Sequence, residues 1–192
     1  MSIEKSKVLI KVLAVAFAFY IIIYSLILFS CTRNNSSNNT SDYEAYLQTA
    51  RGAEVYMPKL EDIGEYKKIV INHKRTEYLL WELNAVSLEI QYDEAEFYSQ
   101  LERINEKYMF LEESTNNLND VDATVQGYNV RIAEMQYNPN DEYFYYYPKC
   151  FMMIGVNEDE YSIVFMYHYD VDLDEIEDLD KFIKKYYVLN LE

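Results

Sequence analysis

The fold of this chain depends on the stretch CFMMIGVNEDEYSIVFMYHY, residues 150–169. Residues 150–156 and 161–169 are apolar at nearly every position, which is typical of strands that are buried on both faces of a sheet. The polar run NEDE at 157–160 separates them and has the composition of a tight turn. We therefore expect a β-hairpin whose two strands lie at the centre of the sheet.

Four more segments have the character of strands. Residues 86–92 alternate apolar and polar side chains with a period of two, as expected when one face of a strand is buried and the other is wet. The segments 66–71, 77–83 and 128–135 are also predicted as strands. A polar turn is expected at 73–76 (HKRT), between the first two of these three segments.

Three helices are predicted among these strands. The longest follows Asp93, which resembles a capping box together with Glu96, and its apolar residues recur at helical spacing. A short helix is expected over 43–50, and the last helix begins at Asp174 or Asp178. These elements predict an α+β domain with a mostly antiparallel sheet of about six strands and helices on one face, preceded by one N-terminal hydrophobic helix.

The N-terminal hydrophobic helix is expected within KVLAVAFAFYIIIYSLILFSC, residues 11–31. Residues 12–29 carry no charge, and at about 1.5 Å per residue such a helix crosses most of a hydrocarbon core of about 30 Å. Lysines precede the run at three positions, and only Arg33 follows it closely. This asymmetry predicts a cell-membrane protein with a cytoplasmic N-terminus and an extracytoplasmic remainder.

Two interpretations of this segment stay open. It is either a permanent signal anchor, since the apolar core of a signal peptide usually spans only about 7–15 residues, or a cleaved signal peptide. The second interpretation rests on the run LFSC at 28–31, which resembles the processing box of bacterial lipoprotein precursors at Leu28, Ser30 and Cys31. Phe29 is bulkier than the residue usual in that box. The resemblance implies cleavage before Cys31 and attachment of lipid to Cys31.

The chain divides into three parts under either interpretation. Residues 1–31 are the signal peptide or signal anchor, and residues 32–41 (TRNNSSNNTS) are a polar tether that has almost no apolar surface to bury. Residues 42–192 are long enough for one domain with its own core. This last part holds 13 basic and 32 acidic residues, a net charge of −19, which disfavours nucleic acid as a partner.

Motifs for catalysis are missing from the sequence, so we predict no catalytic residue and no cofactor. The four glycines form no phosphate-binding loop, and neither GxSxG nor HExxH occurs. Cys150 is expected to be a small buried hydrophobe, and His168 a packed histidine. Asp170, Asp172 and Asp174 begin like a calcium loop, but Glu175 replaces its glycine, so the sequence leaves open whether they bind a cation and predicts no metal site.

Tyrosine is unusually abundant, with 21 residues in the chain. Tyr143, Tyr145, Tyr146 and Tyr147 crowd one predicted loop. Tyrosine supplies a large contact area with a polar tip, so this cluster is a candidate contact surface for an envelope protein, a peptide or a glycan. The alternative is that these rings pack onto the edge of the sheet.

A second resemblance concerns the run YYPKCFMMIG at 146–155, together with YHYD at 167–170. Over roughly residues 56–175 the chain is similar to small exported proteins of clostridia-like bacteria that have no assigned function. The resemblance implies a single exported domain and no particular site. The sequence therefore favours a membrane-tethered binding module, and the alternative is an envelope hydrolase that uses paired carboxylates or a bound cation.

Overall fold

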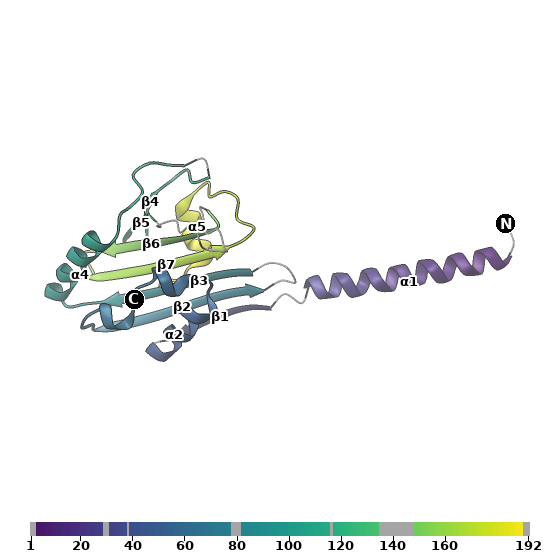
Figure 1. Cartoon of the computed structure of the whole chain (residues 1–192), viewed down its shortest axis with the longest axis horizontal. Helices are drawn as coiled ribbons and strands as arrows, with labels where there is room; N and C mark the ends of the chain where they lie inside the picture. Colours follow the sequence, from purple (N-terminus) through teal and green to yellow (C-terminus); the bar gives the residue numbers. More distant parts are fainter. Residues whose placement is uncertain are drawn as a thin grey trace.

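The computed structural model describes residues 3–28, 31–37, 39–77, 82–115, 117–134 and 148–189. Figure 1 shows a twisted antiparallel sheet with helices packed on it and one long N-terminal helix, α1 (Ile3–Leu28), that projects away from it. The α+β class is therefore confirmed. Within these described residues the sheet has seven strands, namely β1 (Cys31–Ser37), β2 (Lys68–Glu77), β3 (Glu82–Gln91), β4 (Asp122–Val125), β5 (Tyr128–Ala133), β6 (Cys150–Asn157) and β7 (Ser162–Asp170), in the spatial order β1-β2-β3-β7-β6-β5-β4.

The predicted central hairpin is confirmed. β6 and β7 pair in antiparallel register, with Met153 opposite Met166, and β7 pairs on its other side with β3. Nearly all residues of both strands are buried. The continuous apolar runs thus predicted two strands that are covered on both faces.

The prediction that helices cover only one face of the sheet is wrong. On one face, α2 (Thr40–Thr49), α3 (Ala53–Tyr56) and α4 (Glu94–Lys107) join a core that includes Phe165 and Tyr167 of β7. On the opposite face, α5 (Leu179–Tyr186) and the chain after it join a second core that includes Val164 and Met166. Because β6 and β7 are apolar on both faces, each face needs its own cover.

The polar run at 73–76 is part of a strand and not a turn. β2 and β3 form one long ladder of ten residues each, where three shorter strands were expected. The polar side chains are tolerated there because several of them bond to one another across the ladder. His73 Nε2 lies 3.1 Å from Asn84 Oδ1, and Arg75 Nη2 lies 3.3 Å from Glu82 Oε1.

Part of the expected tether belongs to the sheet. Cys31–Ser37 forms the edge strand β1, antiparallel to β2, with Cys31 opposite Glu77. α2 then begins at Thr40, so little of the stretch 32–41 lies outside regular structure. Only residues 29 and 30 separate the end of α1 from β1. The strand is rich in asparagine, serine and threonine, and β2 supplies the partners for its backbone.

Two predicted helix starts are close to those observed. α4 begins directly after Asp93, but the Asp93 side chain makes no capping bond and instead contacts Lys67 Nζ at 2.6 Å. α5 begins after Asp178, whose Oδ1 accepts a hydrogen bond from the backbone N–H of Lys181 at 2.9 Å. The alternative start at Asp174 is therefore wrong. The remaining short element is the 3-10 turn Leu60–Asp62.

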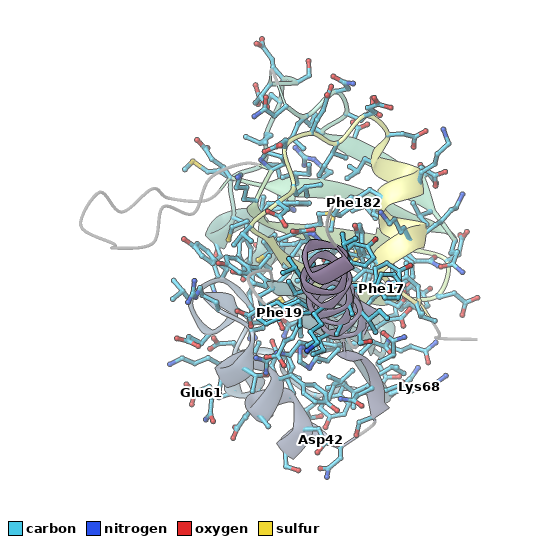
Figure 2. All side chains as sticks on the ribbon, turned by 90° about the vertical axis from the view of Figure 1, so that its right-hand side faces the viewer. Phe17, Phe19, Asp42, Glu61, Lys68 and Phe182 are labelled. Atoms are coloured by element: carbon cyan, nitrogen blue, oxygen red, sulfur yellow. The ribbon has the colours of Figure 1, made fainter. Side chains whose placement is uncertain are left out.

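α1 exposes large apolar side chains on every side. Figure 2 looks from the side on which α1 projects and shows Phe17 and Phe19 pointing outward from it. These two side chains are 64% and 66% exposed, and the other large apolar residues between Val12 and Tyr24 are also about half exposed or more. Taken over the residues whose side chains the structure describes, no helix is long and apolar enough to span a membrane.

Candidate functional site

A cavity of about 560 Å³ lies at the end of the sheet opposite to α1. Three strands contribute to its wall, through Glu89 of β3, Tyr128 of β5 and Ser162 of β7. Two β-turns and the C-terminal segment complete the lining with Gln126, Asn157, Glu160 and Leu189. We call this space the Glu89 cavity.

A buried chain of hydrogen bonds forms one side of the Glu89 cavity. The Tyr128 hydroxyl donates to Glu89 Oε1 at 2.8 Å, and its oxygen lies 2.9 Å from Ser162 Oγ. A phenol has one hydrogen, so the serine hydroxyl is the donor in the second bond. All three side chains are at most 3% exposed, and therefore the carboxylate is held in place by partners that are themselves fixed by packing.

The alternation of β3 explains why a glutamate is buried at this position. Val86, Leu88 and Ile90 point to the face that carries α4, so Glu89 points to the face that carries α5. Sequence reasoning took that second face to be wet, and it therefore missed Glu89. The apolar character of the neighbouring strand could have indicated this burial. β7 pairs with β3 and is apolar on both faces, so the layer that covers the second face of β7 also covers that face of β3.

The electrostatics of the cavity favour ligands that donate hydrogen bonds. Burial, together with the neighbouring Glu89 carboxylate, raises the pKa of the Tyr128 phenol, so the phenol stays protonated at neutral pH. Among the described residues that line the cavity there are two glutamates and no lysine or arginine. An ammonium group or a set of hydroxyl groups would match these acceptors.

The turn between β4 and β5 shapes the mouth of the cavity. Gln126 and Gly127 both have positive φ angles, +50° and +82°, as a two-residue hairpin turn of this type requires. A Cβ atom on Gly127 would lie 2.8 Å from Asn157 Nδ2, and the positive φ angle of Gly127 favours glycine at this position. This close contact places Gln126 and Asn157 at the same rim.

The residues singled out in the sequence do not converge on this cavity. Cys31 lies at the start of β1, at the end of the sheet nearest α1. The predicted contact residues Tyr143, Tyr145, Tyr146 and Tyr147 lie outside the described residues. Their role as a contact surface therefore stays a prediction.

The predicted packed residues are buried as expected. Cys150 is 1% exposed, its Sγ lies 3.1 Å from Tyr167 Oη, and burial raises the pKa of its thiol to about 12. His168 is fully buried among aromatic rings, and burial followed by the charges of Lys185 and Lys74 lowers its pKa to about 3. His73 points to the opposite face, where it contacts Tyr46 of α2, so the two histidines do not meet.

Asp170, the last residue of β7, and the two aspartates that follow it make local contacts. Asp170 Oδ1 accepts a hydrogen bond from the backbone N–H of Asp172 at 3.0 Å, and Asp174 Oδ1 lies 3.6 Å from Lys149 Nζ. Within the described part of the chain, no group of three or more histidine, cysteine, aspartate or glutamate side chains is arranged to hold a metal ion.

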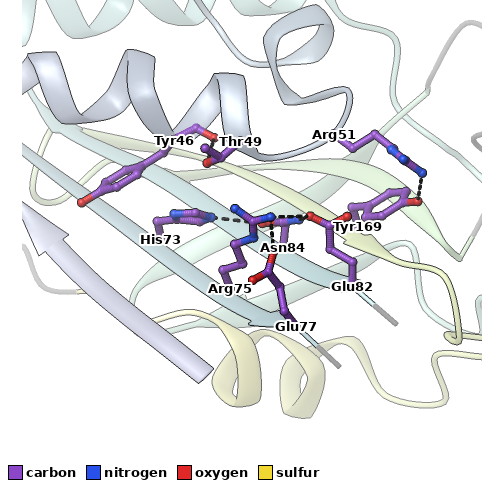
Figure 3. Close-up of polar contacts among 9 residues, drawn as sticks. All are labelled: Tyr46, Thr49, Arg51, His73, Arg75, Glu77, Glu82, Asn84 and Tyr169. Carbon is purple, nitrogen blue, oxygen red and sulfur yellow. Dashed lines mark hydrogen bonds and ion pairs between the residues drawn. The ribbon is translucent and has the colours of Figure 1, made fainter. Parts of the chain in front are cut away.

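A second polar cluster lies beneath α2, near the end of the sheet that leads to α1 (Figure 3). Arg75 forms ion pairs with Glu77 and Glu82, and Asn84 bonds to both Glu82 and His73. Arg51 Nη1 separately donates to the Tyr169 hydroxyl at 3.0 Å. The cluster thus pairs its half-exposed charged groups with one another across β2 and β3.

Comparisons of this chain with models of known protein families, with curated proteins and with solved structures find no match.

Proposed function

We propose that this protein is a membrane-tethered, extracytoplasmic binding module that takes a ligand in the Glu89 cavity. The observation that carries the proposal is the apolar surface of α1, whose large side chains are exposed although the rest of the chain buries two cores. Apolar surface on this scale is stable when lipid or another apolar partner covers it.

The arrangement of the strands supports a defined orientation at the membrane. β1 follows α1 after two residues, and its first residue, Cys31, pairs with Glu77 at the end of β2. Glu89 lies seven residues beyond the start of β3 at Glu82, which is roughly 24 Å along the strand. An anchor at α1 therefore leaves the Glu89 cavity facing away from the bilayer, where a ligand has access.

Cys31 is the proposed lipid-attachment residue. Attachment there would place the acyl chains directly at the edge of the sheet, and two chains suffice for stable anchoring. A retained α1 gives the same topology, since the lysines before it favour a cytoplasmic N-terminus.

Intact-mass analysis of the protein recovered from its native membrane tests the anchor, alongside a Cys31→Ala form. We expect a chain that lacks residues 1–30 and carries a diacylglyceryl group, and we expect the Cys31→Ala form to keep its N-terminal segment. A full-length mass in both forms would establish a retained helix in place of a lipoprotein. Recovery of both forms in the soluble fraction would contradict the tethered module itself.

Occupation of the Glu89 cavity is tested with the full chain in detergent micelles. We expect small primary amines or polyols to raise the melting temperature, and Glu89→Gln to reduce that rise because it removes the negative charge. Glu113→Gln is the matched control, because Glu113 is an exposed glutamate that lies outside the cavity. Equal responses of the two variants to every compound would contradict ligand binding at Glu89.

An envelope hydrolase is the second candidate, because Glu89 and Glu160 line the same cavity. Two carboxylates that flank a substrate can act as acid and base or as acid and nucleophile, according to their separation. Hydrolysis of envelope glycans that is lost in Glu89→Gln and in Glu160→Gln would favour this candidate over a binding module.

A further inference from the structure

A second pocket, of about 240 Å³, lies on the same face of the sheet as α5. Its floor is formed by neighbouring positions of three strands, including Asn34 of β1, Lys74 of β2 and Ser87 of β3. Its far wall is the C-terminal end of α5 and the residues after it, including Lys184 and Lys185. We call it the lysine pocket.

The charge of the lysine pocket is opposite to that of the domain. The chain as a whole carries −16, yet the described residues that line this pocket include three lysines and no aspartate or glutamate. The ammonium groups of Lys74 and Lys185 lie 5.2 and 4.7 Å from the centroid of the same ring, that of Tyr186. They are thus within about 10 Å of each other, a separation at which salt screens exposed charges only in part.

The contacts of the three lysines leave donors available to a ligand. Lys74 Nζ donates to the backbone oxygen of Lys185 at 3.1 Å, and Lys184 Nζ is bonded to Asp180 Oδ2 at 2.8 Å. Asp180 thus offsets one of the three charges. Each ammonium group has three hydrogens, so these bonds do not exhaust it.

Ser87 is the feature that points to a ligand. Its side chain is 1% exposed and lines the pocket, and Oγ has no hydrogen-bond partner among the residues that the structure describes. Buried hydroxyl groups are nearly always bonded. A buried hydroxyl group that can donate, in a pocket that three lysines also line, suits a ligand that is an anion and an acceptor of hydrogen bonds.

The lysines of the pocket also affect the pKa of His168, a buried residue close to the pocket. His168 lies opposite Ala85 in the ladder, next to Ser87 on the same face, and neither of its buried ring nitrogens has a hydrogen-bond partner within the described part of the chain. Lys185 and Lys74 both act to lower the pKa of His168, in addition to the effect of burial. Two lysines of the pocket thus act on the same buried side chain, in a protein whose net charge is strongly negative.

We propose that the lysine pocket binds a phosphate group, through Lys74, Lys185 and the Ser87 hydroxyl. The proposal does not depend on what occupies the Glu89 cavity. The phosphate group can belong to inorganic phosphate or to a lipid headgroup. A lipid headgroup can reach the pocket because Asn34 is only three residues beyond Cys31, where the anchor meets the sheet.

Binding of inorganic phosphate to the full chain in detergent micelles, measured by calorimetry at constant ionic strength, tests the proposal. We expect saturable binding that sodium chloride does not reproduce, and about tenfold weaker binding in Lys74→Gln. Lys59→Gln is the matched control, because Lys59 is an exposed lysine outside the pocket, and it should bind as the unchanged protein does.

Ser87→Ala separates a ligand-binding role from a structural one. The hydroxyl has no partner among the described residues, so its removal should leave the melting temperature without phosphate unchanged or higher, while weakening phosphate binding severalfold. Unchanged phosphate affinity in both Ser87→Ala and Lys74→Gln, or no binding beyond that seen with chloride, would overturn the proposal.

A second arm distinguishes the two sources of phosphate. The full chain is placed in nanodiscs of phosphatidylcholine alone or with phosphatidylglycerol. Free phosphate should bind equally in both nanodiscs if the pocket takes a soluble ion. It should bind less well in the second if an anionic headgroup already occupies the pocket.

Discussion

Tyr128 donates a hydrogen bond to Glu89 across 2.8 Å, and thereby joins β5 to β3 across the central strands β6 and β7, on the face that carries α5. The two residues are far apart in the sequence, and the residues next to them in the sequence do not indicate the contact. The bond holds a carboxylate in a place where it is 1% exposed, and it forms one wall of the Glu89 cavity.

Tyr128→Phe should destabilise the protein. The change removes one hydrogen bond to the buried Glu89 and takes the Tyr128 acceptor from the buried Ser162 hydroxyl, and the loss of buried hydrogen bonds of this kind costs about 1–3 kcal/mol. Urea denaturation of the variant measures this loss. Tyr98→Phe is the control, since Tyr98 is about half exposed, and a loss of the same size there would show that the buried bond is not the cause.

Gly155→Ala should destabilise the central hairpin. A Cβ atom at this position would lie 2.7 Å from Val164 Cγ1 and 3.1 Å from Val130 Cγ2, and overpacking of this kind costs about 1–3 kcal/mol. The free energy of unfolding gives the value. Combining the change with Val164→Ala, which removes the nearest methyl group, should cost less than the two single changes added together. Strict additivity would show that the methyl group does not clash.

His168 should make the stability of the protein depend on pH. Its pKa of about 3 in the folded state lies below the usual value of 6.5, so the unfolded chain binds a proton more readily. Stability that is fully present above pH 6.5 is therefore lost as the pH falls, by up to about 1.4 kcal/mol per pH unit.

Denaturation of His168→Leu between pH 5 and 6.5 measures this contribution. The variant should lose most of the slope that the unchanged protein shows, and it should be relatively more stable at pH 5. His73 is present in both proteins, and because burial lowers its pKa it contributes a smaller dependence of stability on pH in the same direction. An equal slope in both proteins would mean that His168 is already solvated when folded.

Cys150 should resist alkylation in the folded protein. Its thiol is buried and its pKa is raised to about 12, so almost no thiolate is present or accessible at neutral pH. Intact mass after treatment with iodoacetamide, in a Cys31→Ala background, should show no modification without denaturant and complete modification in urea. Fast modification of the folded protein would mean that the segment at Lys149–Cys150 opens.

Several elements follow from the order of side chains alone. The continuous apolar runs of β6 and β7 predicted the central hairpin, and the residue spacing after Asp93 and Asp178 predicted α4 and α5. These features depend on interactions between residues that are close in the chain. Burial of Cys150 and His168 followed from the same runs.

Other elements depend on partners that are distant in the chain. The polar residues of β1 form a strand because β2 offers them a ladder, and the polar run at 73–76 stays extended because His73 and Arg75 bond to residues of β3. Both segments were expected to be irregular, since their composition resembles that of loops.

The order of residues thus specifies the α+β class, the apolar N-terminal helix and the central hairpin, because these depend on local periodicity and on the length of apolar runs. The pairing of strands decides the rest. It places Glu89, Tyr128 and Ser162 around one cavity and Lys74, Ser87 and Lys185 around another. A side chain is buried or exposed according to which distant segment covers its face, and the spacing of residues along the chain does not specify that segment.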